Sequence, residues 1–182
     1  MAYISVPEGE YGIRSLVMFR PDTGRQLYAL VQALLRGDSP LLQAERELIA
    51  AFVSSRNGCR FCTESHAAAA RFLFKEQKDI VDYVLDDYKK APVNGKFRAL
   101  LNVAAKVQVN GKEVTFEDIS DARAHGAVDR EIHDTVLIAA TFSLFNRYVD
   151  GLASLTPSDR AEYDEMGARM GERGYIMPGT TG

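Results

Sequence analysis

Two cysteines and a histidine lie close together in residues 59–66. On a helix that advances about 100° per residue, Cys59, Cys62 and His66 fall at roughly 0°, 300° and 340°, so their side chains share one face. Cys62 and His66 are four residues apart, which brings the imidazole within reach of that thiol, directly or through a water molecule. The spacing therefore predicts a thiol with a base beside it.

The position of the cysteine pair also favours redox chemistry. Cys59 follows Gly58 at the predicted start of a helix, where free N–H groups and the positive end of the helix dipole favour a thiolate. A disulfide needs Cα atoms about 5.5 Å apart, so two cysteines in a first helical turn can form one with little backbone movement. These are the only cysteines among the 182 residues, too few and too close to staple a secreted fold.

Other uses of the pair can be weighed against this interpretation. A c-type haem needs a histidine directly after the second cysteine, where this chain has Thr63. A thioredoxin-like motif follows a strand in an α/β pattern, and no such pattern surrounds Cys59. A structural zinc site generally needs four N or S ligands, and the chain has no second cysteine pair. The zinc site and a pair of buried, inert cysteines stay open as alternatives.

The elements that must position this motif are all predicted to be helices. Apolar residues recur at three- and four-residue spacing, and Gly, Pro or capping residues separate the segments. The predicted helices cover residues 23–37, 41–56, 59–74, 76–88, 96–109, 115–124, 130–152 and 157–170. No hairpin signal and no strand–helix–strand rhythm is found, so we expect an all-α fold of about eight helices.

Length and composition indicate one soluble domain over residues 1–182, with an irregular N-terminal arm (1–22) and a C-terminal tail (171–182) that is loose unless a neighbouring subunit holds it. Hydrophobic residues make up 46% of the chain, enough for a packed core. The net charge of −3 gives no basic excess for nucleic acid. No apolar run approaches the roughly 20 residues of a membrane span, and no secretion signal is present, so we expect a cytoplasmic protein.

The motif resembles that of a known family. The motif consists of Glu47, Cys59, Cys62 and His66, which are separated by eleven, two and three residues. This spacing is similar to that of the alkyl hydroperoxidase D proteins, in the carboxymuconolactone decarboxylase-like superfamily. Further stretches within residues 19–177 resemble its uncharacterised peroxidase-related branch: FRPDTGRQL, LLRGDSPLLQAERELIAAFVSSRNGC, FCTESHAAAA, IAATFSLFNRYVDGL and RGYIMP. The resemblance implies a helical fold with the CxxC motif at the start of a central helix, assembly into homo-oligomers, and peroxide reduction without metal or cofactor.

The resemblance also implies a role for each residue of the motif. Cys62 is the peroxidatic nucleophile and Cys59 the resolving thiol. His66 and Glu47 form a relay that removes the Cys62 proton; Glu45 is close enough to be confused with Glu47, which the family spacing selects. The implied partners are a hydroperoxide and an external thiol or protein reductant, with no nucleic acid and no membrane.

One position departs from the family pattern. The best-known members carry a second relay histidine where this chain has Phe61, which cannot transfer protons, and this leaves open a redox role with another substrate. Arg60 could compensate by stabilising a thiolate.

The polar residues Asn146, Arg147 and Asp150 match an NR-x-x-D segment of the family and could line the pocket, form an oligomer contact or, for Asp150, cap a helix. The sequence thus predicts a dithiol peroxidase. Two alternatives remain: a non-catalytic or redox-responsive helical oligomer, and a decarboxylase-type member of the same superfamily.

Overall fold

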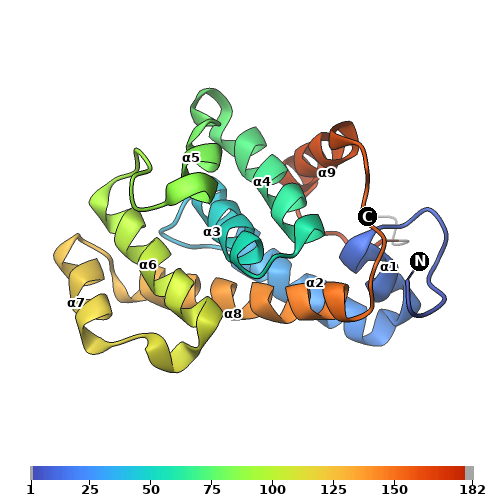
Figure 1. The fold of residues 1–182 in the computed structure, drawn as a ribbon, viewed down its shortest axis with the longest axis horizontal. Coiled ribbons are helices and arrows are strands. Elements are labelled where there is room, and N and C mark those ends of the chain that lie inside the picture. The colour runs from blue at the N-terminus through green and yellow to red at the C-terminus, as the bar shows by residue number, and fades with distance from the viewer. Residues whose placement is uncertain (1, 179–182) are drawn as a thin grey trace.

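The computed structural model describes residues 2–178. Within this range the fold is all-α, with helices joined by turns and loops and no strand, as predicted (Figure 1). The α-helices are α1 (Gly12–Phe19), α2 (Pro21–Arg36), α3 (Gln43–Arg56), α4 (Arg60–Phe74), α5 (Ile80–Asp87), α6 (Gly95–Val109), α7 (Phe116–Ala124), α8 (Asp129–Gly151) and α9 (Arg160–Arg173). Two short 3₁₀ turns, η1 (Lys75–Gln77) and η2 (Gly111–Glu113), interrupt the connections.

Helices α3 and α4 form the centre of the fold. Helix α3 packs mainly against α4, which in turn packs against α9, while the long α8 passes beneath α3 and α6 (Figure 1). Because α3 is covered by neighbours on several sides, ten of its residues are buried, including Leu48, Ile49 and Phe52. A motif carried by α3 and α4 is therefore held by the most densely packed part of the molecule.

A tight turn joins α3 to α4 and sets the cysteine positions. Gly58 adopts a φ of +75°, a left-handed conformation that favours glycine. The N–H of Cys59 then donates to the carbonyl of Ser54 at 3.1 Å, and the carbonyl of Cys59 accepts from the N–H of Thr63 at 3.0 Å. Cys59 is thus the N-cap of α4 and Cys62 lies in its first turn, whereas the sequence predicts both cysteines inside that turn.

The N-terminal arm expected at residues 1–22 is wrong in part, because α1 forms within it. This helix lacks a side-chain cap, which explains why the sequence shows no start signal. Packing against α2 and α8 stabilises it instead, and it buries Leu16 and Val17.

The start of the C-terminal tail is held by its own chain. Helix α9 continues to Arg173, and Gly174 then turns the chain with a φ of +68°. The N–H of Tyr175 donates to Oε1 of Gln32 in α2 at 2.7 Å. The rest of the predicted loose tail, from residue 179 onward, lies outside the described residues.

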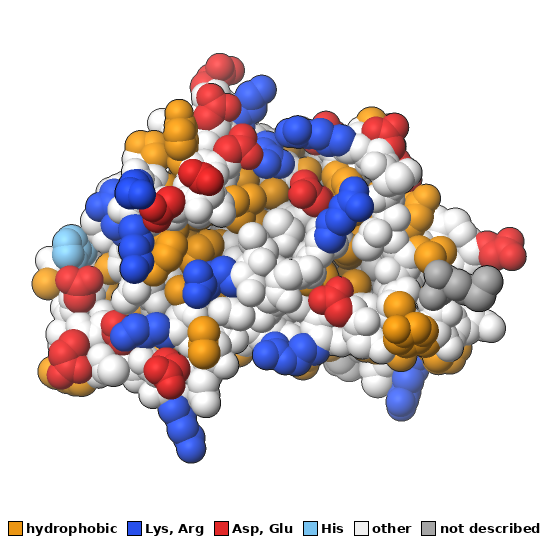
Figure 2. All heavy atoms as spheres, in the orientation of Figure 1, with side chains coloured by type: hydrophobic (Ala, Val, Ile, Leu, Met, Phe, Trp, Pro, Cys, Tyr) orange, Lys and Arg blue, Asp and Glu red, His pale blue; other side chains and the backbone are white. Residues whose placement is uncertain are grey.

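Acidic and basic side chains are interspersed over the face shown in Figure 2, with hydrophobic side chains between them. No helix within residues 2–178 combines the length and the apolar character that crossing a membrane requires.

Candidate active site

The α3–α4 hairpin brings together the four residues that the motif selects. Cys59 and Cys62 are free thiols with relative exposures of 0% and 3%, and they come within 3.4 Å of each other. Glu47 lies on α3 and His66 on α4, so the packing of these two helices determines their contact.

Glu47 and His66 form a buried pair. Oε2 of Glu47 lies 2.6 Å from Nδ1 of His66, and the carboxylate has no exposed surface. Glu45, the other acid considered in the sequence, instead accepts a hydrogen bond from the N–H of Leu42 at the start of α3. The structure therefore brings Glu47, and not Glu45, to the histidine.

Two residues that the sequence analysis did not single out complete this network. Nη2 of Arg36 lies 2.6 Å from Oε1 of Glu47, and the hydroxyl of Tyr175 donates to the same oxygen at 2.7 Å. The ring of Tyr175 also stacks on that of His66, with the centroids 6.1 Å apart. Both residues lie in stretches that resemble the family, LLRGDS and RGYIMP, and this was the only signal that could have found them.

The network keeps Glu47 ionised. Burial raises the pKa of Glu47, but His66, Arg36 and the Tyr175 hydroxyl outweigh this effect and hold the pKa below its ordinary value of 4.5. Burial and the neighbouring carboxylate raise the pKa of Tyr175 well above its usual range, so this phenol remains a neutral donor. An ionised carboxylate only accepts hydrogen bonds, so Nδ1 of His66 carries a proton. In the neutral ring, Nε2 is then the nitrogen that can accept a proton.

Cys62 is a protonated thiol at rest. Hydrogen bonding with Cys59 and burial raise the pKa of Cys62 well above its ordinary value of 9.0. Asn146 acts in the opposite direction, and the negative charge of Asp150 raises the pKa further. The position in the first turn of α4 alone favours a thiolate, but these neighbours outweigh it, so deprotonation requires a base.

A partly enclosed cavity of about 60 Å³ reaches both Cys62 and His66. Most of its walls are apolar or aromatic, and they come from α1, α2, α4, α8, α9 and the segment after α9. The side chains that line it include Ile13, Val31, Phe61, Phe142, Phe145, Met166, Met170 and Tyr175. The enclosed part holds a few water molecules or the O–O group of a peroxide, and the remaining space between the lining residues opens to solvent.

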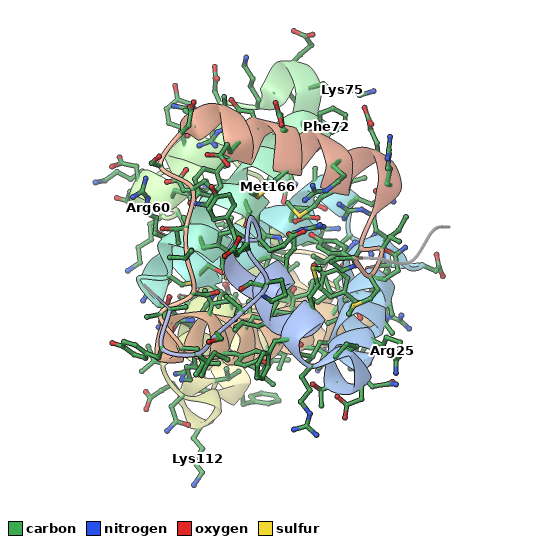
Figure 3. The ribbon with its side chains drawn as sticks, turned by 90° about the vertical axis from the view of Figure 1, so that its right-hand side faces the viewer. Arg25, Arg60, Phe72, Lys75, Lys112 and Met166 are labelled. Atoms are coloured by element: carbon green, nitrogen blue, oxygen red, sulfur yellow. The ribbon has the colours of Figure 1, made fainter. Side chains whose placement is uncertain are left out.

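Phe61, at the position of the second family histidine, is a packing residue. Its ring lies 6.3 Å from that of Tyr163, between centroids, and is 4% exposed. It also fills the space beside Gly12, where a Cβ atom would overlap the ring. Arg60 is exposed and lies at the edge of the molecule in Figure 3.

The NR-x-x-D segment divides between the interior and the surface. The Asn146 amide is buried, donates to the Ser54 hydroxyl at 2.9 Å and accepts from Asn57 at 2.8 Å. Arg147 is exposed and donates to the carbonyl of Ser143 in its own helix.

Among residues 2–178, no three His, Cys, Asp or Glu side chains are grouped closely enough to hold a metal ion.

Comparisons with known proteins support the family and the fold. The model of the carboxymuconolactone decarboxylase family matches residues 21–85. An uncharacterized peroxidase-related protein from Ralstonia eutropha JMP134, described as an alkylhydroperoxidase AhpD core, is 31% identical with a TM-score of 0.75, and the match covers 85% of this chain and 79% of that one. A second uncharacterized peroxidase-related protein, from Silicibacter sp. TM1040, is 25% identical with a TM-score of 0.79 over 90% and 94% of the two chains. No curated protein matches the chain.

A protein of unknown function from Agrobacterium tumefaciens shares the fold, with a TM-score of 0.69 at 20% identity over 87% of this chain and 100% of that one.

Proposed function

We propose that this chain, which belongs to the alkyl hydroperoxidase D-like proteins of the carboxymuconolactone decarboxylase superfamily, reduces hydroperoxides with its Cys59–Cys62 dithiol. One observation carries the proposal: Cys62 and His66 line the same cavity, while Nδ1 of His66 is fixed by the buried Glu47 carboxylate. Because its raised pKa keeps the Cys62 thiol protonated, a base must remove the proton, and His66 is held in an orientation that suits this role.

The first step transfers the Cys62 proton to Nε2 of His66, directly or through a water molecule in the cavity. Glu47 stabilises the imidazolium that forms, because Oε2 already lies 2.6 Å from Nδ1. The thiolate then attacks the outer peroxide oxygen and the O–O bond breaks. Cys62 becomes a sulfenic acid, and the departing alkoxide takes the proton from His66 and leaves as an alcohol.

The second step uses Cys59, which lies within 3.4 Å of Cys62. The Cys59 sulfur attacks the sulfenic acid, a disulfide forms, and hydroxide leaves with the Cys59 proton as water. An external dithiol or protein thiol then donates two electrons and two protons to reopen the disulfide. The balance over one cycle is one hydroperoxide and one dithiol consumed, and one alcohol, one water and one disulfide of the reductant produced.

The two single-cysteine variants test this cycle. We expect Cys62→Ser to lower hydroperoxide consumption in the presence of a dithiol by at least about 10²-fold. We expect Cys59→Ser to form a sulfenic acid that dimedone traps, whereas the parent chain forms an intramolecular disulfide. If Cys62→Ser consumes peroxide as fast as the parent, Cys62 is not the nucleophile and the proposal is lost.

The homo-oligomeric assembly and the cytoplasmic location expected from the sequence remain predictions. Sedimentation of the purified chain and fractionation of its host cells would test them.

A further inference from the structure

Two arginines line the cavity that contains Cys62. Arg14 extends from α1 and Arg169 from α9, and Tyr28 of α2 lines the same cavity. No Asp or Glu side chain is among the described residues that line it. The cavity wall thus carries two arginines, one of which, Arg14, pairs with the Glu10 carboxylate.

The two arginines differ in their partners. Arg14 forms a two-pronged ion pair with Glu10, with N···O distances of 2.7 and 3.2 Å. Within residues 2–178, the side chain of the exposed Arg169 has neither an ion pair nor a hydrogen bond, and partial burial together with the charge of Arg14 lowers its pKa. Burial raises the pKa of Tyr28 to about 12, although Arg14 and Arg169 act against this rise, so the phenol is a neutral donor close to both guanidinium groups.

The carboxylates near these arginines line a second, more open pocket. This pocket shares Arg14 and Arg169 with the cavity, and its other charged residues are Glu10, Glu162 and Glu165. Met166 lines both spaces and is seen beneath α9 in Figure 3. Arg14 and Arg169 thus line both the apolar cavity and this acidic pocket, and the exposed Arg169 side chain has donors left for a ligand.

We propose that Arg169, with Arg14 and Tyr28, binds the carboxylate of an anionic organic hydroperoxide whose O–O group reaches Cys62. This inference rests on the proposed peroxidase function and names the substrate class of that site. The apolar walls accept the organic part of such a substrate, and a planar guanidinium pairs well with a carboxylate.

The test compares three hydroperoxides of one skeleton: cumene hydroperoxide, its para-carboxylate and the methyl ester of that carboxylate. The ester matches the carboxylate in size and lacks its charge. We expect kcat/KM of the parent chain to be about tenfold higher for the carboxylate than for the ester, since charge-assisted hydrogen bonds supply roughly that factor. In Arg169→Met the ratio should fall to about one, and in Arg169→Glu below one.

Arg160→Met is the matched control, because Arg160 is an exposed arginine of α9 that does not line the cavity. It should retain the parent ratio. A parent ratio near one with the ester still reduced would overturn this inference alone, as would an unchanged ratio in Arg169→Met. Failure of the parent to reduce all three compounds would overturn the proposed function as well.

Discussion

The carboxylate of Glu47 lies 2.6 Å from Nδ1 of His66, and no part of Glu47 is exposed to solvent. The same carboxylate pairs with the Arg36 guanidinium, so the buried anion has a cationic partner. A buried ion pair adds little net stability, because desolvation offsets the attraction, but removing one partner leaves a costly isolated charge. This pair is therefore suited to fixing the orientation of His66.

Replacing Glu47 by Gln should lower both activity and stability. We expect kcat/KM for cumene hydroperoxide to fall by about 10²-fold, because His66 loses the anion that stabilises its cationic form. The free energy of unfolding in urea should fall by about 3 kcal/mol, because Arg36 stays buried without its partner. Glu45→Gln is the control, and its activity should match that of the parent. Equal loss in both variants would contradict the assignment.

Acid should remove the stabilisation that Glu47 provides. Folding lowers the pKa of this group, so its contribution is complete above the ordinary value of 4.5 and is lost as the pH falls through the lower pKa of the folded state. We therefore expect the difference in unfolding free energy between the parent and Glu47→Gln to shrink steadily below about pH 4.5. Urea titrations across this range measure it. A difference that is constant with pH would show that Glu47 does not titrate as inferred.

Removing Cys59 should lower the pKa of Cys62. Contact with Cys59 is the largest cause of the raised value, so in Cys59→Ala the pKa should move back toward 9.0. The rate of alkylation by iodoacetamide can be followed against pH on the tryptic peptide FCTESHAAAAR. Trypsin cleaves after Arg60, so this peptide separates Cys62 from Cys59 in the parent. Identical pH profiles in parent and variant would contradict the prediction.

Tyr175→Phe removes only the hydroxyl that donates to Glu47. We expect the unfolding free energy to fall by about 2 kcal/mol, a typical value for a hydrogen bond to a charged group. Loss of this donor raises the folded-state pKa of Glu47 toward 4.5, so the acid-induced loss of stability should be smaller than in the parent and should end at a higher pH. Tyr83→Phe, at a residue that is 57% exposed, should change neither quantity.

Alanine substitutions at two glycines with positive φ distinguish the cost of backbone strain from the cost of steric overlap. Gly9 has a φ of +77° with no atom within 4 Å of an added Cβ, whereas Gly12 has a φ of +53° and an added Cβ would overlap Phe61. Thermal or urea unfolding should show a loss of about 1 kcal/mol for Gly9→Ala from strain alone. Gly12→Ala should lose about 3 kcal/mol, because the Phe61 ring must move. Equal losses of unfolding free energy in the two variants would mean that the Phe61 ring moves aside at no measurable cost.

The sequence by itself determined most of the helices and the shared face of Cys62 and His66. Both depend on contacts three or four residues apart, which helical geometry sets without help from the rest of the chain. It missed α1, whose formation depends on packing rather than on caps.

Only the tertiary structure decided which further groups meet His66. Arg36 and Tyr175 reach Glu47 from positions 11 and 128 residues away, and no local pattern encodes contacts between such distant elements. The raised pKa of Cys62 and the cavity beside it have the same origin. Burial, charge and enclosed volume are properties of packed surfaces, and these exist only once the helices have assembled.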